Sequence, residues 1–331
     1  MSRRLSIAVV QGGPSSEAEG SRSGAAAVLR ALTEGGHQVA RLELDPFLAE
    51  SLRGGGYEVV FPVVHGAVGE DGALQGLFEV LDIPYVGSNV LASAMAMDKR
   101  RARRVFAEEG LPVAKGLALP RGDAAAAVVR ARKEIGARLV VKPSSQGSAI
   151  GVTRLAEEAS DADVARALEE VWELGDVAIV EHFARGREVT CGVLDLFGQE
   201  GRALPPTEIA SPKDAFYTYE ARYAPGRSVH TCPAELGEAL GREVRRVALA
   251  AHRALGCRDL SRADFVVGDG EDVSRLTLLE VNTMPGMTAT SLYPEEAAAE
   301  GLSFPALCDA LVQSAHARGP TRRIAPRPLP R

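Results

Sequence analysis

The stretch RADFVVGDGEDVSRLTLLEVN, residues 262–282, carries the polar pattern that most constrains the fold. Its second half predicts a strand in which Glu280 and Asn282 are two residues apart, so their side chains share one face of a sheet. If the strand that carries Asp264 pairs with it as a hairpin, Asp264 lies opposite Glu280 on that face. Two carboxylates and one amide, without His or Cys, are ligands that Mg²⁺ prefers when phosphate oxygens and water complete its shell. The alternative is a solvated strand face that bears two acids.

The composition is that of an ordinary folded chain. With 331 residues, of which 46% are hydrophobic and 25% charged, the chain has the length for two or three domains. The formal net charge of −6 gives no overall attraction to nucleic acid or to anionic membranes, and no apolar run approaches the roughly 18 residues of a membrane span. The four cysteines lack metal-site or disulfide-framework spacing, and the first residues lack the apolar core of a signal peptide. We therefore expect a cytoplasmic protein with no nucleic-acid and no membrane partner.

Residues 1–95 predict an N-terminal Rossmann-like domain, because continuous apolar strands alternate with helices. Such strands are typical of a buried parallel sheet with helices on both faces. The Gly-rich turn after the first strand is not GxGxxG, so a tight turn is a simpler interpretation than a dinucleotide site. Glu17 at the mouth of this turn would repel an anion and suits a cationic group such as an ammonium. The expected elements are strands at Leu5–Val10, Val39–Leu44, Tyr57–Val64 and Ile83–Val86, and helices at Glu17–Leu32 and Asp71–Leu81.

A domain boundary is expected near residue 95, where a basic helix begins. The remainder divides into a small central α+β domain at 96–183, a C-terminal α+β domain at 184–317, and a Pro- and Arg-rich tail at 318–331 that we expect to be disordered. A long aromatic-rich loop at 204–225 favours a lid over a reacting site, although a structural loop is the simpler alternative. The expected elements are strands at Val113–Leu119, Leu139–Lys142, Val177–Glu181, Ala263–Val267 and Leu276–Val281, and helices at Ala124–Ile135, Asp161–Glu173 and Leu236–Leu255.

Lysine is rare in this chain, since only five of the 38 basic residues are lysines. Lys142 ends a strand that opens into a loop of small residues at 143–151. The backbone N–H groups of such a loop can cradle phosphate oxygens while the lysine neutralises their charge. Because the lysine precedes the glycines, this is not the order of a P-loop, and a plain glycine hairpin is the alternative.

Seven motifs, in order along about residues 7–295, resemble those of the D-alanine–D-alanine ligase family within the ATP-grasp superfamily. Three positions depart from the family pattern: Arg222 stands where Lys is usual, Gly20 where Val is usual, and Met284 where some members have Ser. The motifs are GGPSSE (12–17), HGAVGEDG (65–72), VVKPSSQGSAIGV (140–152), GREVTCGV (186–193), FYTYEARY (216–223), SRADF (261–265) and EVNTMPGMTATSLYP (280–294).

This resemblance implies an ATP-grasp fold and ATP-dependent ligation of two D-alanines through an acyl phosphate, for peptidoglycan precursor synthesis. The implied cofactors are ATP and two Mg²⁺ ions, for which Mn²⁺ could substitute, and the implied assembly is a homodimer formed through the first domain. The nucleotide would contact Lys99, Lys142, Ser148, Glu181, His182, Phe183, Ala184, Glu188 and Arg222, and the metal ions would be held by Asp264, Glu280 and Asn282.

The resemblance also assigns the amino-acid substrates. Glu17 would bind the ammonium of the first D-alanine, with His65 beside it, and Arg262 with the backbone N–H of Gly286 would form an oxyanion hole. Ser291 and Leu292, at the start of a helix, would receive the carboxylate of the second D-alanine. Tyr223 would reach Ser148 and Glu17 and close the lid.

Three alternatives stay open. Another ATP-grasp ligase, for example one that joins D-alanine to D-lactate, would share the phosphate and metal residues and differ in its acceptor pocket. Tyr223 is neutral at pH 7 and does not repel an ammonium, which favours D-alanine as the acceptor. A nucleotide-binding sensor without enzymatic activity would need Lys99 and Lys142 but not Arg262 with the metal residues. His65 could be structural, with one ring nitrogen bound to the adjacent turn.

Overall fold

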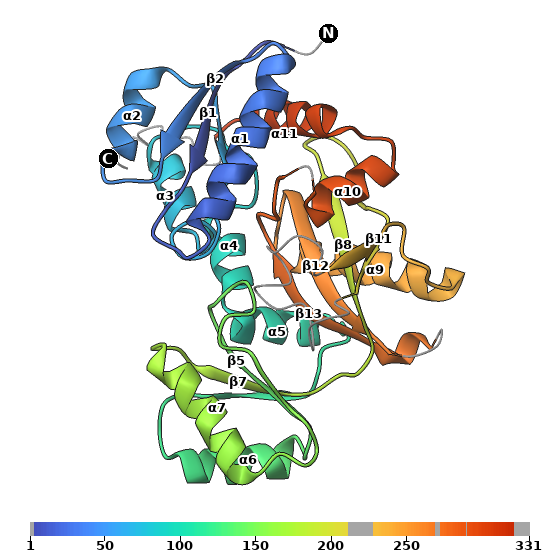
Figure 1. The fold of residues 1–331 in the computed structure, drawn as a ribbon. Helices are drawn as coiled ribbons and strands as arrows, with labels where there is room; N and C mark the ends of the chain where they lie inside the picture. Colours follow the sequence, from blue (N-terminus) through green and yellow to red (C-terminus); the bar gives the residue numbers. More distant parts are fainter. Residues whose placement is uncertain (1–2, 211–227, 269–271, 289, 321–331) are drawn as a thin grey trace, which may run out of the picture.

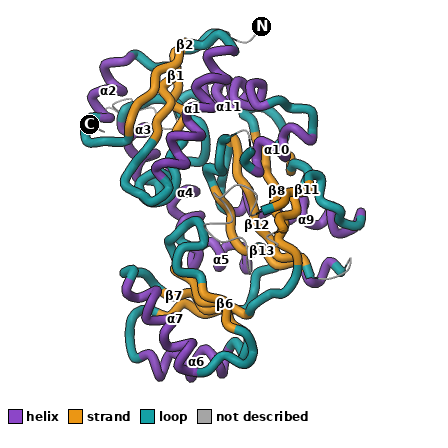
Figure 2. The backbone as a smooth tube through the Cα atoms, in the orientation of Figure 1, coloured by secondary structure: helices purple, strands orange, loops and turns teal. Residues whose placement is uncertain are grey.

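The computed structural model describes residues 3–210, 228–268, 272–288 and 290–320. Within these ranges the strands form three sheets, each with helices packed on it. The N-terminal sheet lies at the top of Figure 1, the largest sheet at its right and the small central unit at its bottom. Figure 2 shows the same three groups of strands. The mixed α/β class expected from the sequence is confirmed.

The N-terminal unit is built on a parallel sheet in which β1 lies between β2 and β3. One face packs on α1, and the other packs on α2 and α3. This confirms the buried parallel sheet, although the expected strand at 83–86 contributes only an isolated bridge between Val60 and Tyr85. The elements are β1 (Ser6–Gln11), α1 (Ala18–Glu34), β2 (Gln38–Glu43), α2 (Leu48–Gly55), β3 (Val59–Pro62) and α3 (Ala73–Val80).

A helix from the far end of the chain completes the cover of this sheet. α11 (Phe304–Arg318) packs beside α1, and its Leu311 belongs to the same buried cluster as Ile7 of β1. His37 Nε2 lies 3.0 Å from Asp309 Oδ1 of α11. The hydrophobic core of the N-terminal unit is therefore assembled from both ends of the described chain.

Arg318 corrects the expected start of the disordered tail. It is the last residue of α11, and its Nη1 donates to Asp259 Oδ1 at 2.6 Å, a contact that fixes this end of the helix. Residues 321–331 lie outside the described residues.

The central unit has the small α+β form expected from the sequence. Its antiparallel sheet has the order β4-β7-β5-β6, with α6 and α7 packed against it. α7 begins where predicted because Ser160 and Asp163 form a capping box, in which each side chain accepts a hydrogen bond from the other's backbone N–H. The elements are β4 (Gly116–Leu119), α6 (Ala124–Glu134), β5 (Leu139–Pro143), β6 (Thr153–Leu155), α7 (Asp161–Glu173) and β7 (Ala178–His182).

The C-terminal sheet is antiparallel, with the order β11-β10-β8-β12-β13 and β9 on the edge of β8. Its core joins α9 with α4 and α5, because Ala92 and Phe106 pack with Val244 and Phe265. The expected domain boundary at residue 95 thus lies inside α4. The elements are α4 (Val90–Met97), α5 (Lys99–Glu108), β8 (Arg187–Asp195), β9 (Arg202–Ala203), β10 (Thr207–Ala210), β11 (Val229–Thr231), α9 (Glu238–Ala254), β12 (Asp259–Val267), a 3₁₀ turn (Val273–Arg275), β13 (Leu276–Asn282) and α10 (Leu292–Ala299).

The expected loop at 204–225 begins with a strand instead. β10 pairs with β8 on one side and with β11 on the other. The aromatic run and Arg222 and Tyr223 lie outside the described residues.

The hairpin of β12 and β13 has the predicted register. Asp264 pairs with Glu280 and Arg262 pairs with Asn282, with a bulge following Asp264. Because residues directly opposite one another on adjacent strands point to the same face, the four polar side chains gather on one surface of the sheet.

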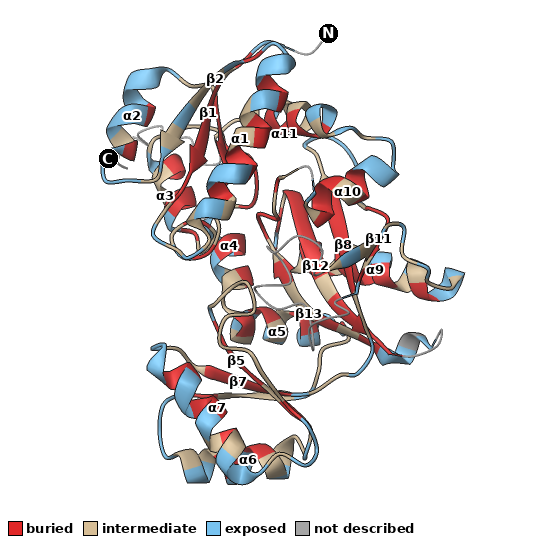
Figure 3. Ribbon diagram, in the orientation of Figure 1, coloured by how far each residue is buried: buried red, intermediate tan, exposed pale blue. Residues whose placement is uncertain are grey.

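The described helices and strands bury their apolar faces against the three sheets, as the red segments of Figure 3 show. Across the described ranges, every helix is too short or too polar to span a bilayer.

We expect Leu311→Ala in α11 to lower the free energy of unfolding by about 2–5 kcal/mol, since it leaves a cavity between the helix and the N-terminal sheet. Leu311 is 0% exposed, whereas Leu91 of α4 is 67% exposed. Urea unfolding of both leucine-to-alanine variants checks this, with Leu91→Ala expected to change stability little. Equal losses would show that α11 does not complete this core.

Candidate active site

A cleft between the central sheet and the C-terminal sheet gathers most of the residues expected to bind a nucleotide. Its apolar walls come from both sheets, and its charged groups come from α5, β5, β6, β7, β8 and β13. The lining residues are Lys99, Ala114, Val140, Lys142, Pro143, Gln146, Gly147, Ala149, Val152, Arg154, Glu181, His182, Phe183, Ala184, Glu188, Val266, Thr277, Leu279 and Glu280.

Glu181 holds two cations at the back of this cleft. Its Oε2 lies 2.7 Å from Lys142 Nζ, and its Oε1 lies 2.6 Å from Arg103 Nε. All three side chains are largely buried, and buried charges are stable only when each lies beside an opposite charge. Glu181 was expected to recognise adenine, but the structure also makes it the counter-ion of Lys142. Arg103 was not predicted.

Glu188 and Phe183 also line this cleft. Arg154 Nη2 donates to Glu188 Oε1 at 2.6 Å, and its guanidinium carbon lies 5.2 Å from the centre of the Phe183 ring. Cation–π contact of this kind fixes a flat arginine beside a ring. The expected ribose-binding carboxylate therefore lies in the cleft with its orientation held by Arg154.

The carboxylates of β12 and β13 lie between lysine and arginine. Lys99 Nζ is 3.0 Å from Glu280 Oε2 and donates to the Gln146 carbonyl at 2.7 Å. Asp264 accepts four hydrogen bonds, two at 2.8 Å from Arg262, one at 2.8 Å from Thr190 and one at 3.0 Å from Asn282. The predicted meeting of Asp264, Glu280 and Asn282 is thus observed.

This donor set fits a divalent cation that accepts phosphate oxygens as further ligands. Among the described residues, no three His, Cys, Asp or Glu side chains are grouped as a metal site, so the chain offers two carboxylates and an amide rather than a complete cage. Mg²⁺ is usually bound through one or two carboxylates plus substrate phosphates. Since Asp264 already accepts four hydrogen bonds, a cation there would replace one donor.

A second cavity lies between the N-terminal unit and the C-terminal sheet. It combines residues of the first and last motifs, which are more than 260 positions apart in the chain, and brings together Glu17, His65, Arg262, Gly286, Ser291 and Leu292 as expected. Ser291 is the N-cap of α10, so the start of this helix faces the cavity. The lining residues are Glu17, Glu19, Gly20, Ser23, His65, His230, Arg262, Gly286, Met287, Thr288, Thr290, Ser291 and Leu292.

The loop after Lys142 connects the two cavities. Ser148 Oγ donates to Glu17 Oε1, and both Ser148 and Ala149 have left-handed backbone conformations, with φ of 50° and 57°. Consecutive non-glycine residues in this region are strained and persist only when their surroundings hold them. Glu17 therefore fixes the loop that leads from the nucleotide cleft to the second cavity.

His65 and Glu70 lie behind Glu17. Burial lowers the pKa of His65, although Glu17 raises it, so the ring tends to be neutral. Burial, reinforced by the charge of Glu17, raises the pKa of Glu70 to about 8. Glu70 Oε2 accepts from the Gly66 N–H at 2.7 Å and lies 4.0 Å from His65 Nδ1. Sequence reasoning missed Glu70, whose only signal was its place in the HGAVGEDG motif.

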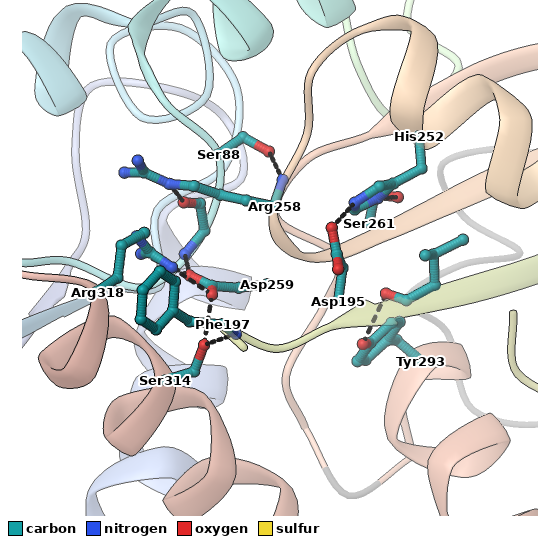
Figure 4. A network of polar contacts seen from close by, with 12 residues as sticks. Ser88, Asp195, Phe197, His252, Arg258, Asp259, Ser261, Tyr293, Ser314 and Arg318 are labelled. Carbon is teal, nitrogen blue, oxygen red and sulfur yellow. Dashed lines mark hydrogen bonds and ion pairs between the residues drawn. The ribbon is translucent and has the colours of Figure 1, made fainter. Parts of the chain in front are cut away.

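A buried cluster of Ser261, His252 and Asp195 has the residue types of a hydrolase triad (Figure 4). Ser261 Oγ lies 2.7 Å from His252 Nδ1, and His252 Nε2 lies 3.3 Å from Asp195 Oδ2. Ser261 and His252 are 1% and 0% exposed, so no substrate reaches the hydroxyl. The cluster joins α9 to β8 and β12, and it is structural.

Two family models match the chain: one described as the D-ala D-ala ligase C-terminus over residues 105–313 and one as the D-ala D-ala ligase N-terminus over residues 48–88. The D-alanine–D-alanine ligase of Anaeromyxobacter dehalogenans is 45% identical over 310 residues, which cover 93% of this chain and 96% of that protein.

Similar solved structures include the D-alanine–D-alanine ligase of Coxiella burnetii, with a TM-score of 0.79, 29% identity and coverage of 95% of this chain and 96% of that one. The Bacillus anthracis ligase complexed with ATP has a TM-score of 0.78 and 28% identity, and the match covers 95% of this chain and 98% of that one.

We expect the proton on Glu70 to contribute stability near pH 5 that is lost as the pH rises to about 8, so the free energy of unfolding should fall more over this range in the wild type than in Glu70→Gln. The unfolded carboxyl ionises near its ordinary value of 4.5 and the folded one near about 8, so between these values the folded state holds the extra proton. Urea unfolding across this range measures the slope, with Glu134→Gln, a surface carboxylate paired with Arg130, as control. Equal slopes in wild type and Glu70→Gln would show that Glu70 ionises normally.

Proposed function

The chain belongs to the D-alanine–D-alanine ligase family, and from that premise we propose that it joins two D-alanine molecules at the expense of ATP, as a step of peptidoglycan precursor synthesis. ATP phosphorylates the carboxylate of the first D-alanine, and the amine of the second attacks the acyl phosphate and releases phosphate. The observation that carries this proposal is the shared position of Arg262, which lines the second cavity and binds Asp264 beside the nucleotide cleft.

In the nucleotide cleft, Lys99 and Lys142 would contact the phosphates by exchanging their carboxylate partners for phosphate oxygens. The buried carboxylate of Glu181 would accept a hydrogen bond from adenine, because a carboxylate oxygen can accept a second hydrogen bond beside its ion pair. The backbone of 182–184 would donate and accept the other hydrogen bonds to adenine. Glu188, held by Arg154, would bind the ribose hydroxyls.

Asp264, Glu280 and Asn282 would hold Mg²⁺, two ions by resemblance to the family. A bound Mg²⁺ neutralises the charge that develops on the transferring phosphoryl group. Glu280 lines the nucleotide cleft, and Asp264 lies opposite it on β12, two residues from Arg262 of the second cavity.

In the second cavity, Glu17 would bind the ammonium of the first D-alanine, and His65, largely neutral, would lie beside it without repelling it. Arg262 and the backbone N–H of Gly286 would stabilise the oxyanion that forms during attack. Ser291 and the first turn of α10 would bind the carboxylate of the second D-alanine, because a helix N-terminus attracts an anion.

We also propose that the protein acts in the cytoplasm, where ATP is supplied, and that it forms a homodimer through the N-terminal unit. Large exposed hydrophobic side chains at Phe47 and Val80 support this placement of the dimer contact, being 65% and 72% exposed.

We expect D-alanine alone to sustain phosphate release from ATP and L-alanine alone not to do so. From equal amounts of D-alanine and D-lactate near pH 7, we expect the dipeptide to be the main product. Glu19 lines the cavity as well as Glu17, and its carboxylate favours an acceptor that carries an ammonium over D-lactate, which carries none. Phosphate release and chromatography of the products check this. Predominance of D-alanyl-D-lactate would contradict the assigned acceptor, and phosphate release without either amino acid would contradict the ligase reaction.

We expect Glu280→Gln to lower Mg²⁺-dependent ADP formation at least about 100-fold, because the amide supplies no charge to a metal ion. ATP binding without metal should persist. Glu300→Gln, which removes a surface ion pair with Arg202 outside both cavities, is the matched control. A near wild-type rate in Glu280→Gln would overturn the metal assignment.

A further inference from the structure

A buried carboxylate joins the N-terminal unit to the C-terminal sheet (Figure 4). Asp259, the first residue of β12, is 0% exposed. Its Oδ1 accepts from Arg318 Nη1 at 2.6 Å and from Ser314 Oγ at 2.9 Å, and its Oδ2 accepts from Arg318 Nη2 at 2.9 Å and from the Gly87 N–H at 2.8 Å. One carboxylate thus connects β12, α11 and the loop that ends the N-terminal unit.

The loop at residues 85–88 is held from two sides. Arg318 Nη2 donates to the Tyr85 carbonyl at 2.8 Å, and Arg258 Nε donates to the Gly87 carbonyl at 2.8 Å. The Arg258 guanidinium carbon also lies 4.8 Å from the centre of the Tyr85 ring. Gly87 has φ of 98°, a backbone conformation that favours glycine, and a Cβ there would lie 2.9 Å from the terminal methyl of Met284, which follows β13.

The two cavities depend on this junction in different ways. The amino-acid cavity takes Glu17 and His65 from the N-terminal unit but Arg262 and Ser291 from the C-terminal one. The described residues that line the nucleotide cleft all lie between Lys99 and Glu280, and none of them comes from the N-terminal unit. Asp259 precedes Arg262 by three residues on β12, or about 10 Å along the strand.

We propose that Asp259 and Arg318 are positioning residues for the amino-acid cavity. By fixing the loop at 85–88 and α11 against β12, they set the separation between Glu17 and Arg262, the two groups that would hold opposite ends of the first D-alanine. This inference rests on the proposed ligase function. It assigns the last turn of α11 a role in amino-acid binding that lies outside both cavities.

The guanidinium of Arg318 suits this role because its planar fork donates to both oxygens of Asp259. A lysine would keep the charge but donate from a single point, so the carboxylate would lose one of the two hydrogen bonds that it accepts from Arg318. Displacements of about 1 Å in a substrate-holding group can change activity by as much as about 100-fold.

The test is the KM for each substrate in Arg318→Lys. We expect the KM for D-alanine to rise roughly tenfold or more. We expect the KM for ATP to stay within about twofold, because the nucleotide cleft lies away from the junction. The matched control is Asp309→Asn, which removes the carboxylate charge beside His37 inside the N-terminal unit and should leave both KM values unchanged.

An unchanged KM for D-alanine in Arg318→Lys, or equal rises for D-alanine and ATP, would overturn the proposal. If Arg318→Lys does not fold, Ser314→Ala decides the question, since it removes one hydrogen bond to Asp259 and should raise the KM for D-alanine alone; no rise would overturn the proposal. Failure of the ligase assignment itself is distinguishable, because the wild-type protein would then form no ADP in response to D-alanine.

Discussion

The pairing of β12 with β13 places Arg262, Asp264 and Glu280, the charged groups that link the two cavities. A register shift of one residue would turn the side chains of the shifted strand to the other face of the sheet. The observed register puts Arg262 opposite Asn282 and Asp264 opposite Glu280, and Thr190 of β8 fixes Asp264 from the other side. Since Arg262 faces one cavity and Glu280 the other, a single hairpin sets the relation between the amino-acid and nucleotide sites.

Each lysine of the cleft forms an ion pair with a carboxylate, which a bound phosphate would replace. Lys142 with Glu181 and Lys99 with Glu280 keep buried charges paired and pointed into the cleft. A buried cation without a partner would tend to lose its proton or withdraw to solvent. The ion pairs therefore keep the lysines positively charged where phosphate would bind. A phosphate that binds there exchanges one anion for another at lysines that are already in place.

The sequence was informative where partners are close in the chain and poor where they are distant. The β12–β13 register and the start of α7 follow from local alternation and a capping box. The motifs placed the residues of both cavities, although the roles given to them rest on resemblance. α11 was not among the predicted helices, and its cover of β1 could not follow from the sequence pattern, because an apolar helix face does not reveal which sheet it meets. Arg103 and Glu70 were missed for the same reason, since their importance depends on Glu181 and Glu17, which other elements supply.

The cover of β1 by α11 also bears on how the chain is made. The strand leaves the ribosome early, but the helix that buries one of its faces follows roughly 300 residues later, which at about 5–20 residues per second is about 15–60 s of translation. During that interval Ile7 and Val9 lack their partners from α11. The core of the nascent N-terminal unit therefore stays incomplete until the ribosome has synthesised α11. Until then the unit exposes an apolar surface of the kind that chaperones bind.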